Sequence, residues 1–243
     1  MSTPASGSAA LRNRADPADD ALRLTRLEAR LPPLLSVIAG MVDLTGFFTL
    51  GHIFTAHITG NLVVASAAAV YGGFFNVAQA LAIPVFMLAL AVAWVIAQAS
   101  HRRGPRLARL LLSVQFMLLA AILVFSVITK PSTSQYGPMA GIAVMIAVSA
   151  MACQYALLRL AIPGAISTAA MTGNLTNTVL SLMDLVSRRH PLLPVDAGRL
   201  TRSFHLLFGF LLGCVVGAAA VALLGDWAWS LPAVLAGVAI AVR

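Results

Sequence analysis

Long apolar runs recur along the chain, and they restrict the folds open to it more than any other feature. The runs lie at about 34–51, 58–74, 78–99, 109–129, 138–158, 166–183, 204–225 and 228–242. A helix of about 20 residues crosses a hydrocarbon layer about 30 Å thick, and several runs reach that length. Only 10% of the 243 residues are charged, whereas a soluble domain carries about 25%. The sequence therefore predicts a polytopic membrane protein.

The same runs decide the expected fold class. Transmembrane strands alternate apolar and polar residues, and these runs contain no such alternation. Continuous apolar stretches suit helices, because a helix makes its backbone hydrogen bonds within the segment. We therefore expect an all-α fold, a polytopic membrane helix bundle with the lipid bilayer around it.

A polar tripeptide occurs twice within this apolar sequence. The copies are Thr59-Gly60-Asn61 and Thr172-Gly173-Asn174, and leucine follows each of them. Aligning the copies pairs the first four apolar segments with the last four, which is typical of a duplicated unit. We expect a single transmembrane domain at 33–243, with one repeat at about 33–130 and the other at about 138–243.

Arginine clusters between the segments indicate how the chain crosses the bilayer, since cytoplasmic loops carry an excess of Lys and Arg. Residues 1–32 are expected to form a basic cytoplasmic tail that is disordered or loosely helical. If all eight segments cross, the loop from Arg102 to Arg109 falls outside together with Arg159. If the two short segments after the tripeptides dip in and return, these arginines and those at 188–202 all lie inside.

The second arrangement has six crossings and two re-entrant segments. Each repeat then holds about three spanning helices plus one short or re-entrant helix, and an odd number of crossings makes the two repeats inverted. Many transporters are built from inverted repeats, with the substrate site between them near the bilayer midplane. We favour this arrangement, and eight crossings with one exceptional basic loop is the alternative.

The tripeptides predict where a site would lie. Asparagine is a strong helix N-cap and glycine lets the chain bend, so we expect helices to begin at Asn61 and Asn174. Non-helical backbone survives at membrane depth only where protein buries it or a water-filled cavity faces it. Two helix N-termini meeting there suit an anion or a polar solute. The plainer alternative is two tight turns between helices.

Asp43 lies near the middle of the first apolar segment. A carboxylate on an isolated helix there costs about 2.5–3.5 kcal/mol, so it should face the bundle interior. It is either a proton carrier or a structural hydrogen-bond acceptor. His57 either shares a proton with Asp43 or caps a turn. Gln154 is the expected counterpart of Asp43 in the second repeat, so that one half titrates while the other only hydrogen-bonds.

These observations give one set of candidate substrate-binding residues. The set is Asp43, His57, Thr59, Gly60, Asn61, Gln154, Thr172, Gly173 and Asn174. We expect no cofactor and no metal, because no Gly-rich nucleotide loop follows a strand and no Cys/His cluster has ligand spacing. We also expect no enzyme, because no motif pairs a nucleophile with a base and no two carboxylates are predicted at one depth.

The formal net charge of +8 is explained by membrane orientation, so no nucleic-acid partner is expected. Gly209, Gly213 and Gly217 recur every four residues in the seventh apolar segment. Small residues at this spacing let two helix backbones approach closely. The contact lies either within the fold or at the seam of a homodimer.

Four stretches of the chain resemble a known family. They are Ala39-Gly40-Met41-Val42-Asp43 with Gly46-Phe47, Phe54 through Asn61, Gln154 through Arg159, and Thr168 through Asn174. In these residues the chain resembles the YoaK-like family of bacterial multi-pass membrane proteins, a domain-of-unknown-function family (number twelve seventy-five). The resemblance extends from about residue 33 to the C-terminus. It implies a bacterial inner-membrane protein of about six spans and no particular substrate.

Two functions remain open from the sequence. The first is a transporter or channel for a small polar or anionic solute or ion, with its site at the two tripeptides and with proton coupling through Asp43. The second is a non-transporting membrane scaffold or regulator. In both, we expect the chain in the bacterial inner (cytoplasmic) membrane with a cytoplasmic N-terminus.

Overall fold

The computed structural model describes residues 17–71, 76–166, 168, 171–186 and 198–241. These residues form α-helices, two short 3₁₀ helices and their connections, which confirms the expected all-α class. The elements are α1 (Pro17–Thr49), α2 (Ile58–Tyr71), α3 (Val77–Ala99), α4 (Gly104–Thr129), η1 (Pro131–Ser134), α5 (Pro138–Ala161), α6 (Met171–Val186), α7 (Arg199–Leu224), η2 (Gly225–Trp229) and α8 (Ser230–Ala241).

Among the described residues, five stretches are long and apolar enough to cross a membrane. They are Ala29–Thr49, Val77–Ala99, Gly104–Thr129, Pro138–Ala161 and Leu200–Ala241. The last is 42 residues long, and as one straight helix it would measure about 63 Å, twice the hydrocarbon thickness. It turns back at η2 instead, and α8 packs against α4 and α1. The chain is therefore a helical membrane bundle.

The first helix begins earlier than the sequence suggested. We expected a disordered or loosely helical tail through residue 32, whereas α1 is helical from Pro17; residues 1–16 lie outside the described residues. The stretch before the first span is rich in Ala, Leu and Arg, which favour helix. Pro32 and Pro33 lie inside α1. They remove two N–H donors but do not end the helix.

The tightest helix contact in the bundle joins α1 to α7. A Cβ atom on Gly213 would overlap the Val37 carbonyl, and one on Gly209 would lie 2.9 Å from the Pro33 carbonyl oxygen. Gly217 meets the backbone of Met41 in the same way. Of the two alternatives for these glycines, the structure shows packing within the fold. A homodimer stays a prediction, and these glycines are already covered within one chain.

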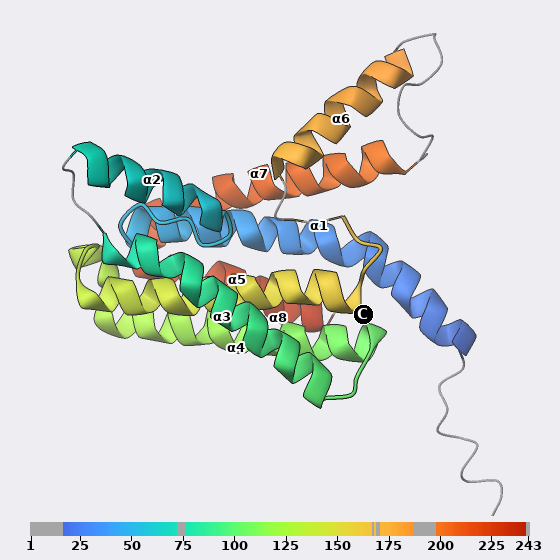
Figure 1. Cartoon of the computed structure of the whole chain (residues 1–243), viewed down its shortest axis with the longest axis horizontal. Helices are drawn as coiled ribbons and strands as arrows, with labels where there is room; N and C mark the ends of the chain where they lie inside the picture. The colour runs from blue at the N-terminus through green and yellow to red at the C-terminus, as the bar shows by residue number, and fades with distance from the viewer. Residues whose placement is uncertain (1–16, 72–75, 167, 169–170, 187–197, 242–243) are drawn as a thin grey trace, which may run out of the picture.

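Apart from the first turns of α2 and α6, most helix ends lie at one of two ends of the bundle (Figure 1). At one end, which we call the turn end, Ser132 of η1 donates to Asp226 of η2 at 2.6 Å, and Gln135 donates to the Phe48 carbonyl of α1 at 2.7 Å. The α3–α4 connection, the end of α5 and the start of α7 lie at the opposite end. We call it the basic end, because it carries Arg102, Arg103, Arg159 and Arg202.

Candidate functional site

The chain breaks its helical path between α1 and α2. Residues 50–57 leave the turn end and fold back along α1, and α2 then starts near the middle of the molecule and returns to the turn end (Figure 1). The hydrogen bonds agree, since residues 55–57 reach Asp43, six positions before α1 ends at Thr49. Six helical residues correspond to a depth of about 9 Å. We call residues 50–57 the first connection.

A corresponding path follows α5. The chain leaves α5 at the basic end, and α6 starts near the middle of the molecule and runs back toward that end (Figure 1). Residues 162–166 and 168 belong to this second connection, and residues 167, 169 and 170 lie outside the described part. Both tripeptides therefore lie near the middle of the long axis, at the first turns of α2 and α6.

Asp43 is buried, with 2% of its surface exposed. Its Oδ1 accepts hydrogen bonds from the backbone N–H of Thr55 at 2.7 Å, the backbone N–H of Ala56 at 2.6 Å and the Thr55 hydroxyl at 3.1 Å. Three donors on one oxygen offset much of the cost of removing a carboxylate from water. Asp43 therefore holds the first connection against α1.

The other carboxylate oxygen of Asp43 faces His57. Its Oδ2 lies 2.5 Å from His57 Nδ1, and 30% of the His57 side chain is exposed. A carboxylate beside Nδ1 favours the tautomer with the proton on that nitrogen, which leaves Nε2 as the other ring nitrogen for proton exchange. The His57 ring packs edge-on to Phe210 of α7 with centroids 5.0 Å apart. The structure thus brings Asp43 and His57 together, 14 residues apart in sequence.

Asn61 has a different role from the predicted N-cap. α2 already begins at Ile58, so Thr59, Gly60 and Asn61 are helical. The buried Asn61 side chain accepts from the Phe54 N–H at 2.9 Å and donates to the Phe54 carbonyl at 2.7 Å. It clamps the first connection onto α2 through a contact that a local capping rule does not describe.

Gly60 also differs from its predicted role, because it lies within α2 and makes no bend before the helix. A Cβ there would lie 3.0 Å from the Phe54 ring, so the absence of a side chain at Gly60 leaves room for that ring. Thr59 is exposed on the first turn. Substitution of Gly60 would therefore disturb the same Phe54 residue that Asn61 holds.

In the second half, one contact of Gln154 corresponds to a contact of Asp43. Its Nε2 donates to the Leu35 carbonyl at 3.0 Å and lies 3.5 Å from the Thr168 hydroxyl. Thr168 precedes Asn174 by six residues, as Thr55 precedes Asn61. In the first half the Asp43 carboxylate contacts Thr55, and in the second half the Gln154 amide contacts the equivalent Thr168.

The remaining predicted residues lie on the first turn of α6. The described part of α6 starts at Met171, so Thr172, Gly173 and Asn174 are helical and the predicted N-cap at Asn174 is wrong as well. Thr172 and Gly173 are exposed, and Asn174 is 2% exposed with its Nδ2 4.0 Å from the Met171 sulfur.

Two residues without a predicted role complete the site. Tyr155 donates its hydroxyl to the Ala56 carbonyl at 2.7 Å, and Gln115 of α4 donates to Gln154 Oε1 at 2.8 Å. Both are polar residues inside apolar runs, and this feature of the sequence could have marked them as candidates for the interior. Because Gln154 and Tyr155 are neighbours, one turn of α5 contacts both connections.

The fold and this interior define a class, namely a helical membrane protein whose interior holds two breaks in the helical path lined by polar side chains. A family model described as protein of unknown function (DUF1275) matches residues 31–242, and the chain belongs to this family. The match confirms the family expected from the resemblance, whereas the name YoaK-like comes from the resemblance alone. No curated protein and no solved structure matches the chain.

Proposed function

We propose that the protein transports or conducts a small polar or anionic solute through the region where the two connections meet. The observation that carries this proposal is the contact of both connections with one turn of α5. Tyr155 bonds the first connection and Gln154 approaches the second. Irregular backbone at membrane depth is typical of a substrate path in transporters.

The helix packing supports two repeats of opposite orientation. α1 packs on α7, and α5 packs on α3. Exchanging α1 with α5 and α7 with α3 turns the first contact into the second. The exchange also relates α2 to α6, whose first turns lie near the middle and whose last turns lie toward opposite ends (Figure 1). Inverted repeats of this kind alternate access by moving one unit against the other.

The solute class follows from the groups at the centre. The first turns of α2 and α6 present backbone N–H groups and the positive ends of the helix dipoles. The exposed Thr59 and Thr172 add hydroxyl groups beside them. The positive ends of two helix dipoles suit an oxygen-bearing or anionic solute.

Proton coupling in this proposal runs through His57 rather than through Asp43 alone. The carboxylate is buried and holds four donor groups, so it acts as a fixed partner. His57 is partly exposed, and its Nε2 exchanges the proton with the solute path. The Asp43 carboxylate stabilises the protonated ring.

We further propose that the basic end faces the cytoplasm of a bacterial inner membrane. The arginines at 102–109, 159 and 202 share this end, and cytoplasmic loops are the ones enriched in such residues. α1 starts at the same end, so this orientation gives a cytoplasmic N-terminus. These arginines are far apart in sequence, so their position at one end of the bundle supports a single cytoplasmic side.

The test is solute flux in proteoliposomes with an imposed pH gradient, comparing His57→Asn with His101→Asn. An asparagine amide nitrogen replaces Nδ1 beside Asp43 but does not titrate, so the change removes the proton and keeps a donor. We expect His57→Asn to lose pH-driven accumulation and to keep exchange of the solute. His101 lies in the α3–α4 connection, so His101→Asn should leave both pH-driven accumulation and exchange of the solute unchanged.

Equal pH-driven uptake by both variants would remove His57 from the mechanism. Absence of flux for every solute in a panel of anions, amino acids and sugars would favour the scaffold alternative. Asp43→Asn is a poor first test, because it also weakens the anchoring of the first connection.

A further inference from the structure

Helix α6 carries its apolar side chains outside and its polar side chains inside. The large apolar side chains described in it are all exposed, and they are Leu175, Val179, Leu180, Leu182, Met183 and Val186. Apart from the buried Met171, the less exposed side chains are polar, namely the buried Asn174 and the half-buried Asn177, Thr178, Ser181 and Asp184. We call these five residues the polar face of α6. Since α6 packs on α7, this face is turned toward the bundle, as polar residues of membrane helices generally are.

The polar face of α6 leads from the middle of the molecule to the basic end. Asn174, Asn177 and Ser181 are spaced by three and four residues, so they follow one another along one side of the helix. α6 starts near the middle and runs toward the basic end (Figure 1). The ten residues from Asn174 to Asp184 span about 15 Å, which is half of a hydrocarbon layer about 30 Å thick.

Helix α7 offers this face few hydrogen-bond partners. From Leu206 to Leu224, α7 carries no hydroxyl, amide or charged side chain. The Thr178 hydroxyl bonds within α6, to the Asn174 carbonyl at 2.8 Å. Within the described residues, no hydrogen bond joins the Asn177 or Ser181 side chain to α7. Because an unpaired polar group is costly to keep away from water, we expect water along this face.

A buried hydroxyl on α7 gives a second, independent indication of water. Ser203 is 0% exposed, and its Oγ has no hydrogen-bond partner among the described residues. Ser203 and Phe210 are seven residues apart, about two turns, so they share one face of α7. Phe210 packs on the His57 ring of the central site. A buried hydroxyl that the protein leaves unpaired is normally satisfied by water, and this one lies between the basic end and His57.

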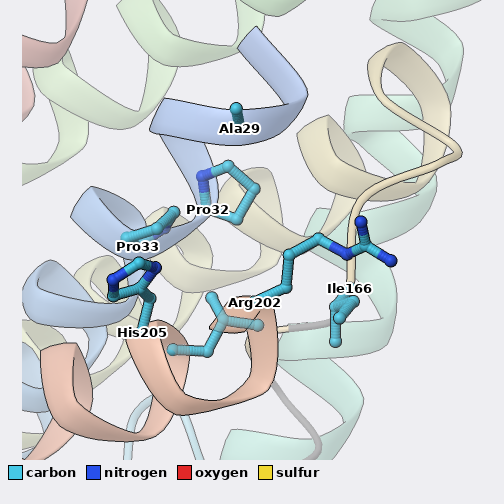
Figure 2. Close-up of a pocket in the computed structure, with 7 residues that line it drawn as sticks. Ala29, Pro32, Pro33, Ile166, Arg202 and His205 are labelled. Carbon is cyan, nitrogen blue, oxygen red and sulfur yellow. The ribbon is translucent and has the colours of Figure 1, made fainter. Parts of the chain in front are cut away.

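The α1 side of α7 is closed to a solute. Gly209, Gly213 and Gly217 bring the backbones of α7 and α1 into contact. The cleft that opens between these helices at the basic end, beside Pro33 and Ile166, has a volume of only about 30 Å³ (Figure 2). That volume holds a few water molecules and no organic solute. A polar route along α7 is therefore better placed on the side that packs against α6.

The corresponding positions of α2 are apolar. Aligning the two tripeptides pairs Asn177 with Val64 and Ser181 with Ala68. α2 runs from the middle to the turn end (Figure 1). The amide and hydroxyl groups that line α6 are thus missing from the helix that leads to the other end. The two halves of the molecule differ in this respect, although their tripeptides are identical.

We propose that the polar face of α6 lines a hydrated half-channel between the basic end and the central site. The half-channel along α2 is dry in this conformation, so the structure corresponds to the state open toward the basic end. Amide and hydroxyl groups both donate and accept hydrogen bonds, so they replace water around a hydroxyl or carboxylate group of a passing solute. Passage of a solute rests on the proposed transport function, whereas hydration of the face does not.

The experiment measures how fast engineered cysteines react with a charged, membrane-impermeant methanethiosulfonate in sealed membrane vesicles of both orientations. The thiolate is the reacting form, and it forms where water reaches the sulfur. Asn177→Cys and Ser181→Cys probe the polar face of α6, and Val64→Cys and Ala68→Cys are the matched positions of α2. Leu182→Cys is the control on the exposed apolar side of α6. We expect the first two variants to react at least tenfold faster than the other three.

The reaction should occur from the side that also labels Arg103→Cys, because Arg103 is exposed at the basic end. Equal rates for Ser181→Cys and Leu182→Cys, or for Ser181→Cys and Ala68→Cys, would overturn the half-channel. Faster reaction from the turn end would overturn it too. The two native cysteines give the background, measured in the unchanged chain. An unchanged melting temperature for each variant shows that its rate belongs to the folded protein, and Asn177→Cys tests the same face independently.

Flux in proteoliposomes separates this proposal from the transport function. Fast labelling of Ser181→Cys without flux of any solute would refute transport and leave a hydrated face. Flux that survives modification of Ser181→Cys as fully as modification of Leu182→Cys would refute passage along this face and leave transport intact. We expect modification to lower the flux of Ser181→Cys at least tenfold and to leave that of Leu182→Cys unchanged.

Discussion

Asn61→Ala tests the role of the first tripeptide most simply. The change removes both bonds between the Asn61 amide and the Phe54 backbone, at 2.9 and 2.7 Å. Each backbone group left without a partner costs about 1–3 kcal/mol. Since Phe54 is only half-buried, we use the lower part of this range, about 2–4 kcal/mol for the pair of groups.

The corresponding fall in melting temperature is about 4–16 °C, at about 2–4 °C per kcal/mol for a chain of this size. Thermal unfolding of the detergent-purified protein measures it. Thr59→Ala is the matched control, because Thr59 is exposed on the same turn, and it should change the unfolding free energy by under about 0.5 kcal/mol. Equal melting temperatures for Asn61→Ala and Thr59→Ala would refute the clamp.

Further predictions concern the helix contacts around the site. Gly213→Ala, whose new Cβ overlaps the Val37 carbonyl, should destabilise the protein by about 3 kcal/mol. Gly237→Ala, whose Cβ would lie 3.3 Å from the Phe116 ring, should cost under about 1.5 kcal/mol; equal melting temperatures for the two would contradict the α1–α7 contact. Tyr155→Phe removes the bond to the first connection and should cost about 1–2 kcal/mol, again read from thermal unfolding. A melting temperature equal to wild type would exclude that bond.

The helix positions were predictable because they depend on local composition. An apolar run ends where charged, Gly or Pro residues begin, whatever the rest of the chain does. The run at 138–158 became Pro138–Ala161, and the run at 78–99 became Val77–Ala99. The largest error at this level is the start of α1, which is helical from Pro17 although a tail was expected through residue 32. A smaller error is the start of α2, expected at Asn61 and found at Ile58. The capping rule treats Asn as a local acceptor, whereas Asn61 serves a connection that folds back.

The site was only partly predictable because its contacts are long-range. The sequence predicted that the Asp43 carboxylate faces the bundle interior, because a carboxylate facing lipid is costly. That His57 shares a proton with Asp43 was one of two hypotheses for this histidine. Which donors surround it depends on how deeply the first connection folds back. Tyr155 and Gln115 were missed for the same reason, since their partners lie 99 and 39 residues away in sequence. No spacing rule covers such distances.

The accessibility of two engineered cysteines tests the central claim most directly, namely that the halves are inverted with the basic end in the cytoplasm. Arg103→Cys places a thiol in the exposed α3–α4 connection, and Thr133→Cys places one at the exposed turn end. The buried Cys153 and half-buried Cys214 give the background, measured in the unchanged chain. With a membrane-impermeant maleimide on intact cells, we expect Thr133→Cys to react and Arg103→Cys to react only after permeabilisation. Reaction of Arg103→Cys in intact cells would contradict the account.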